Sequence, residues 1–180
     1  TEVRQEKALI RYGRSQLIGL VKGVSENFNQ GHELDTTIID GTFALRHEGE
    51  DMAVIGSAVQ AYLGVSVKDP FRNLQIFSPN KAAPTGAFSP ADEFIVRAIR
   101  PAGVFEVQQQ FDDMVLVPLA FARDLLNEPD KISSVEINLK AGESSASFQR
   151  ELEKKLGKAF TVRDRVQQNQ LLYKILNSEK

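Results

Sequence analysis

The chain of 180 residues contains no cysteine and no tryptophan, and only two histidines. Without cysteine it can form no disulfide framework, no thiolate metal site and no thiol nucleophile. No segment approaches the roughly 18 consecutive apolar residues of a membrane-spanning helix. A large charge of one sign is missing too, because 22 basic residues stand against 24 acidic ones and the net charge is −2. That balance argues against a disordered chain and predicts no nucleic-acid partner.

The charge that is present is distributed unevenly along the chain. Residues 148–180 hold eight basic and four acidic side chains, so the remainder of the chain is acidic. A solvated helix face is one interpretation of this basic end, and a basic segment beside an acidic body is the other. The sequence starts at Thr1 without a leader-like segment, so we expect a soluble piece of a longer protein.

Local patterns predict an α+β fold. The uninterrupted apolar run 17–21 predicts a central strand covered on both sides, and the alternation over 135–140 predicts a strand with one buried face. Residues 1–5 are interpreted as the end of a helix or a frayed terminus. Strands are expected at 7–11, 16–24, 36–39, 51–56, 65–69, 74–77, 94–100, 102–107, 114–117, 135–140 and 160–163. Helices are expected at 57–63, 118–127, 145–156 and 165–178, with Ser57 and Ser144 or Ser145 as N-caps.

The sequence offers no assembled active site. His32 and His47 are isolated in polar segments, which favours surface histidines over metal ligands. The acids Glu48, Glu50 and Asp51 lack the spacing of a calcium loop, and Gly56-Ser57 lacks the flanking glycines of a nucleophile elbow. We therefore predict no enzyme, no catalytic residue, no metal site and no cofactor.

Several short motifs occur in the order typical of one transporter family. They are Lys22-Gly23-Val24-Ser25, Ile39 to Phe43, Ala53 to Val65, Ala102 to Phe105, Phe111 to Leu119 with Leu125-Leu126, and Asn169 to Lys180. Together they resemble the periplasmic domain of ABC transporter permeases of the lipoprotein-releasing (LolC/LolE), macrolide-exporter (MacB) and FtsX-like type. The chain departs from that pattern at Ser25, where proline is common, and at Asp69-Pro70, where a Gly-Asp turn is usual.

The resemblance implies a two-lobed domain facing the periplasm, carried by a bacterial inner-membrane permease. Residues 1–24 and 131–180 would form a membrane-proximal, porter-like lobe of β-α-β type near lipid headgroups. Residues 25–130 would form an inserted, β-rich α+β lobe, membrane-distal and sabre-like. A cytoplasmic ATPase subunit would act on the lobes through the spans of the full-length permease, together with a second permease copy or paralogue. The function so implied is mechanical transmission that moves lipoproteins to a periplasmic carrier.

The long irregular stretch Ser78–Asp92 contains three prolines, which exclude a regular helix or a central strand. In the lipoprotein-releasing branch a loop in the corresponding place hooks the carrier. By resemblance, the partner-binding residues of such a hook are Pro79, Asn80, Lys81, Pro84, Thr85, Gly86, Phe88 and Pro90. A plain surface connection with a buried Phe88 is the alternative.

Two other functions stay open. One is the ectodomain of an efflux (MacB-like) or FtsX-like permease, which docks a membrane-fusion protein or a cell-wall hydrolase regulator. The other, of a different class, is a soluble ligand-binding protein or enzyme, for which a pocket with strongly shifted pKa values is expected.

Overall fold

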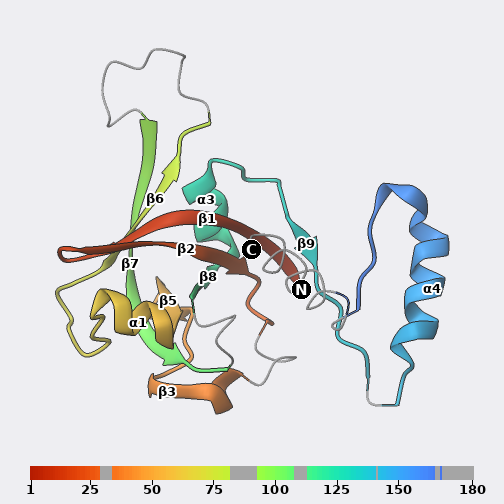
Figure 1. The fold of residues 1–180 in the computed structure, drawn as a ribbon, viewed down its shortest axis with the longest axis horizontal. Helices are drawn as coiled ribbons and strands as arrows, with labels where there is room; N and C mark the ends of the chain where they lie inside the picture. Colours follow the sequence, from red (N-terminus) through yellow and green to blue (C-terminus); the bar gives the residue numbers. More distant parts are fainter. Residues whose placement is uncertain (29–33, 82–92, 108–112, 141, 165–166, 168–180) are drawn as a thin grey trace, which may run out of the picture. The chain divides into compact units, whose positions relative to one another are not determined.

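The computed structural model describes residues 1–28, 34–81, 93–107, 113–140, 142–164 and 167 (Figure 1). The chain forms two compact units, Thr1–Glu136 and Ile137–Lys180. The predicted lobes, one made of residues 1–24 and 131–180 and the other of residues 25–130, stay a prediction. The two compact units divide the chain at another place, between Glu136 and Ile137. None of the helices in the described part is long and apolar enough to cross a bilayer.

The first unit is a mixed α+β structure in which strands predominate, so the α+β class is confirmed. Its strands are β1 (Glu2–Tyr12), β2 (Ser15–Val24), β3 (Ile38–Gly41), β4 (Arg46–His47), β5 (Glu50–Gly56), β6 (Leu74–Pro79), β7 (Phe94–Phe105), β8 (Met114–Pro118) and β9 (Ser134–Val135). Its helices are the 3-10 helix η2 (Leu34–Thr37), α1 (Ser57–Leu63) and α3 (Leu119–Leu126).

Six of these strands pair in a closed ring. Their order is β7-β6-β1-β2-β8-β5, and β5 pairs with β7 again. The β1–β2 hairpin lies in the middle of this order, with its two strands side by side in Figure 1 and Gly13 (φ 60°) at its turn. The strand β1 pairs with β6 in antiparallel orientation, and β2 pairs with β8 in parallel orientation. Residues from the start of the chain therefore pair with strands from its middle.

The strand β7 closes the ring because its two halves have different neighbours. Its first half pairs with β6, from Pro79↔Phe94 to Leu74↔Ile99, and its second half pairs with β5 and β3. The sequence predicted two strands, 94–100 and 102–107, separated at Pro101. A single strand forms instead, and the ladder with β5 absorbs the proline through a register shift next to the pair Ala53↔Pro101.

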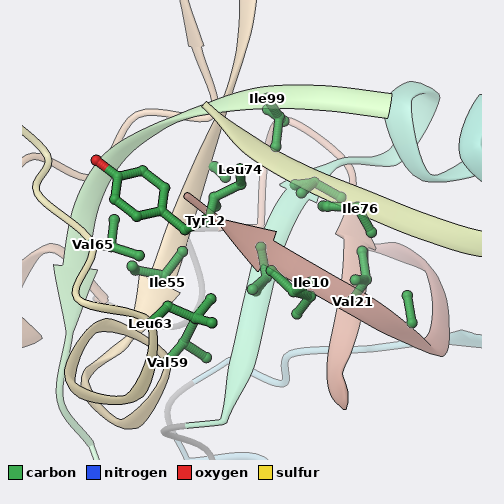
Figure 2. Packing of buried hydrophobic residues seen from close by; sticks show 14 of the residues in the cluster. Ile10, Tyr12, Val21, Ile55, Val59, Leu63, Val65, Leu74, Ile76 and Ile99 are labelled. Carbon is green, nitrogen blue, oxygen red and sulfur yellow. The ribbon is translucent and has the colours of Figure 1, made fainter. Parts of the chain in front are cut away.

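Two apolar clusters pack against the two sides of the strands. The first includes Ile10, Val21, Ile55, Leu74, Ile76 and Ile99 with Val59 and Leu63 of α1 and Phe121 and Leu125 of α3, and Figure 2 shows part of it. The second joins Val3, Val24, Val54, Phe105 and Leu116 to Phe28. Because successive strand residues point to opposite sides, we call the side that faces α1 and α3 the helix side and the other the far side.

Several local predictions for this unit were wrong. Residues 1–5 belong mostly to β1, because Val3 pairs with Val24 and is fully buried. Residues 65–69 form no strand, and residues 67–68 lie in a turn. The strand containing 17–21 is central, but Ile18 is 72% exposed, so the run is not covered on both sides. Ser57 is the first residue of α1, and Gly56 occupies the N-cap.

The second unit contains α4 (Ser145–Leu156) and the short 3-10 helix η3 (Gly157–Ala159). The predicted cap is confirmed, because the Ser144 hydroxyl accepts a hydrogen bond from the Ser147 N–H, and Gly157 ends the helix at φ 63°. Residues 137–140 and 160–163 do not form strands. The buried face expected over 135–140 is absent, since Val135 is 55% and Ile137 51% exposed. Apart from Gln167, the predicted helix 165–178 lies outside the described residues.

Candidate functional site at the base of the β6–β7 connection

The predicted hook residues begin where the β6–β7 hairpin leaves the ring. Pro79 pairs with Phe94 as the last pair of the ladder, and the Asn80 N–H then donates to the Glu93 carbonyl at 2.7 Å. Lys81 follows directly. The structure thus places Pro79, Asn80 and Lys81 at the base of the connection between β6 and β7, whereas Pro84, Thr85, Gly86, Phe88 and Pro90 lie outside the described residues.

Ion pairs tie this base to the ring. The Lys81 ammonium lies 2.9 Å from a Glu6 carboxylate oxygen on β1 and 3.6 Å from Glu128, which follows α3. The hydrogen bond to Glu6 raises the pKa of Lys81 above its ordinary value. Lys81 therefore keeps its charge at any physiological pH and connects one end of the hairpin to two elements far away in sequence.

Glu128 is the centre of this group of charges. Its side chain is 11% exposed and forms ion pairs with Arg4, whose side chain is 12% exposed, and with Lys131 at 3.1 Å. Hydrogen bonds from Arg4 and Lys131 lower the pKa of Glu128 from 4.5 to about 2. The two donors outweigh the partial burial, which by itself raises the pKa, so the carboxylate stays ionised well below neutral pH.

Arg4 extends the group along β1. Its guanidinium pairs with Glu6 at 2.7 Å and donates to the Ser133 hydroxyl at 2.9 Å. The same hydroxyl accepts the Gln5 backbone N–H at 3.0 Å. We call Arg4, Glu6, Lys81, Glu128 and Lys131 the hairpin clamp, since these five side chains join β1, the hairpin and the segment after α3.

A second contact connects the other hairpin strand to α3. Arg97 on β7 forms an ion pair with Asp124, with its terminal nitrogen 3.2 Å from a carboxylate oxygen. This hydrogen bonding raises the pKa of Arg97 and lowers that of Asp124. Charge pairs thus connect Lys81, two residues after β6, and Arg97 on β7 to the body of the first unit.

The described residues contain no group of three His, Cys, Asp or Glu side chains that could hold a metal ion. Two shallow hollows lie elsewhere on the first unit. One, of about 350 Å³, is lined by Gly13, Phe71, Arg72, Asn73, Gln75 and Ala98, and one of about 180 Å³ includes His47 and Arg100. Among the described residues, none of the groups with a shifted pKa lines either hollow.

Sequence reasoning missed most of the hairpin clamp. Arg4 and Glu128 are separated by 124 residues, and each occurs in a segment whose local pattern gives it no special role. Only the order of strands along the ring brings them together, so a periodicity or motif search had no signal to find.

Comparison with known proteins gives a likeness of fold. No family model matches the sequence, and no curated protein is significantly similar to it. Among solved structures, the chain is similar to the periplasmic region of MacB from Actinobacillus actinomycetemcomitans, with a TM-score of 0.51 and 13% identity. It is also similar to the extracellular domain of the noncanonic ABC-type transporter YknZ from Gram-positive bacteria, with a TM-score of 0.55 and 15% identity.

These matches cover 86% and 87% of the chain, which spans 64% of the MacB region and 74% of the YknZ domain. The resemblance inferred from the ordered motifs is therefore confirmed at the level of fold. Both neighbours are extracytoplasmic domains of transporters.

Proposed function

We propose that this chain is the extracytoplasmic domain of an ABC transporter permease and that it transmits movement rather than catalysing a reaction. The observation that carries the proposal is the fold shared with the MacB and YknZ domains over more than four-fifths of the chain. A cytoplasmic ATPase subunit would change the arrangement of the membrane spans of the full-length permease, and the domain would follow. Rigid-body motion between two states is a common form of such coupling.

The hairpin clamp supports a mechanical role for the β6–β7 hairpin. Charge pairs connect Lys81, just after β6, and Arg97 on β7 to β1 and α3, so a displacement of the body would move the hairpin strands with it. Segment 79–90 follows directly in the chain and is the proposed place of partner contact. Prolines at 79, 84 and 90 reduce the conformational entropy that such a segment loses on binding.

Within this function, we propose lipoprotein release as the first candidate. Residues Pro79 to Pro90 would engage a soluble periplasmic lipoprotein carrier, as a hook does. The second candidate is an efflux or FtsX-like permease in which the same segment contacts a membrane-fusion protein or a hydrolase regulator. The fold shared with MacB and YknZ fits this candidate as well as the first.

The full-length sequence tests the permease assignment, because it should show an apolar run of about 18 residues or more on each side of this segment. Reconstitution of the full-length protein with its ATPase in nanodiscs tests the mechanical role. ATP hydrolysis should then respond to substitutions in the hairpin clamp. If the apolar runs are missing, the permease assignment fails.

Purified carrier and membrane-fusion protein are then compared in pulldowns with the same nanodiscs. The variants are Phe88→Ala and a Gly/Ser replacement of 82–90 of equal length, with Tyr62→Ser, a 69% exposed position on α1, as the control. Loss of carrier binding in the first two supports lipoprotein release. Unchanged carrier binding removes the hook assignment, and selective loss of membrane-fusion protein binding supports the second candidate.

A further inference from the structure

An uncovered row of apolar side chains crosses four strands on the far side of the ring. Leu9 lies opposite Ile18 on one neighbour and opposite Phe77 on the other, and Phe77 lies opposite Val96. At about 4.8 Å per strand the row is about 14 Å long. Ile18 is 72% exposed and Val96 41%, so the row reaches solvent.

Only one part of the far side is exposed in this way. Further along the same two strands, Val3 and Val24 also point to the far side and are almost completely buried beneath the second cluster with Phe28. The far side is thus closed at one end of the β1–β2 hairpin and open at the other. Adjacent exposed apolar residues of this kind mark interaction sites, unlike single scattered ones.

The charged residues at the far-side positions of β1, β2, β6 and β7 have one sign. They are Lys7, Arg11, Lys22 and Arg100, with no acidic residue, because Glu2 and Glu6 point to the helix side. Lys22 is ion-paired with Glu136 at 2.7 Å. In the described part of the chain, Lys7 and Arg11 have no carboxylate partner.

Arg11 is held in a defined orientation beside the row. Its guanidinium lies 4.8 Å from the centre of the Phe77 ring, and its Nε and one terminal nitrogen both donate to the Gln75 side-chain oxygen, at 2.9 and 2.5 Å. The N–H groups at the end of the guanidinium, which Gln75 does not use, lie in one plane and suit a bidentate carboxylate. Arginine and aromatic side chains placed together are also typical of the energetic centres of protein interfaces.

We propose that this row, with Lys7 and Arg11 at its border, is a docking surface for a protein segment that presents carboxylates beside apolar side chains. The apolar side chains would cover Ile18, Leu9, Phe77 and Val96, and a carboxylate would pair with Arg11. None of these residues belongs to segment 79–90, and the inference holds independently of the transporter assignment.

Two other occupants fit the geometry less well. A second copy docked on the same face by two-fold symmetry would set Lys7 and Arg11 against the same basic residues. An anionic bilayer would require apolar side chains that protrude from a tip or a helix face, whereas these side chains lie in the middle of paired strands.

The test is an NMR titration of the ¹⁵N-labelled chain with a synthetic 14-residue peptide that alternates Leu or Phe with Asp or Glu. A matched peptide carries Asn and Gln in place of the acids. We expect shifts centred on the amides of Leu9, Ile18, Phe77 and Val96, and at least tenfold weaker binding of the amide peptide. Shifts centred elsewhere, equal affinity for the two peptides or no binding up to millimolar concentration would overturn the proposal.

Single substitutions show which side chains bind the peptide. Ile18→Ser and Arg11→Gln should each weaken binding of the acidic peptide about tenfold or more, while Tyr62→Ser on α1 should leave it unchanged. Arg11→Lys keeps the charge without the planar donors and should give an intermediate loss, which separates a specific pairing from general attraction. An unchanged affinity in Ile18→Ser contradicts the proposal.

Vesicles of phosphatidylglycerol and sedimentation of the chain alone complete the test. Vesicle binding that Ile18→Ser abolishes while the acidic peptide does not compete would identify a membrane contact and overturn the protein partner. Self-association at micromolar concentration that Ile18→Ser abolishes would identify a second copy as the occupant and overturn it as well.

Discussion

Gly23 on β2 and Ala122 on α3 approach so closely that a Cβ atom placed on Gly23 would lie 2.2 Å from the Ala122 Cβ. Both residues are buried, and the contact sets the distance at which α3 lies over the ring. Because the helix also carries Asp124 of the Arg97 pair, this distance affects the support of the β6–β7 hairpin.

The first prediction follows from this contact. Gly23→Ala should reduce the free energy of unfolding by about 1 to 3 kcal/mol, because the added methyl group overlaps a buried neighbour. In urea unfolding, the double variant Gly23→Ala/Ala122→Gly should recover part of that loss, after correction for Ala122→Gly alone. If the two single effects simply add, the steric explanation is wrong.

The second prediction compares two isoleucines on paired strands. Ile10 is fully buried in the first cluster, whereas Ile18 is 72% exposed on the far side. Ile10→Val should cost about 1 kcal/mol of unfolding free energy by removing a packed methylene group, and Ile18→Val almost nothing. The matched pair is measured by thermal and urea unfolding, and equal effects would show that the far side is covered at Ile18.

The third prediction concerns pH. The pKa of Glu128 is about 2 in the folded chain against an ordinary value of 4.5, so the unfolded chain binds this proton first as the pH falls. The stabilisation from Glu128 is therefore complete above about pH 4.5 and is lost progressively towards pH 2. Glu128→Gln should lower the unfolding free energy at pH 7 by about 1 to 2 kcal/mol and reduce its dependence on pH between 4.5 and 2.

The control for this experiment is Glu151→Gln on α4. Glu151 is also paired, with Lys155 at 2.7 Å, but both side chains are well exposed. Its removal should change stability far less than Glu128→Gln does. Equal effects at the two positions would mean that the partly buried surroundings of Glu128 add nothing.

The fourth prediction separates local from global stability at the hairpin. Lys81 is 51% exposed, so Lys81→Met should change the global unfolding free energy by only about 0 to 1 kcal/mol. Without these two ion pairs the end of the β6–β7 ladder should open more often. The Asn80 amide, which donates a hydrogen bond to the Glu93 carbonyl, should then exchange with deuterium several times faster. Lys155→Met, which removes the pair on α4, should leave Asn80 exchange unchanged.

Much of the fold followed from local sequence pattern. The strands expected at 7–11 and 16–24 form the β1–β2 hairpin, and Gly64 and Asn127 end α1 and α3 near the predicted helix ends. The cap at Ser144 was predicted in the same way. These features depend on backbone geometry within a few residues, so the sequence contains their cause locally.

The same local reasoning failed where residues far away in sequence determine whether a segment forms a strand. Residues 1–5 have a polar pattern, yet they form a strand because Val24 on one edge and Val135 on the other supply hydrogen-bonding partners. Residues 137–140 alternate as a strand should, but no partner strand pairs with them in the described part of the chain.

The sequence by itself thus determined the α+β class, most turns and caps, and an order of motifs that pointed to transporter ectodomains. Only the tertiary structure decided the closed ring, the shared strand β7, the hairpin clamp and the uncovered row beside Arg11. Each of these depends on which strands become neighbours. That choice is made by burial and pairing between residues many positions apart, which no local pattern records.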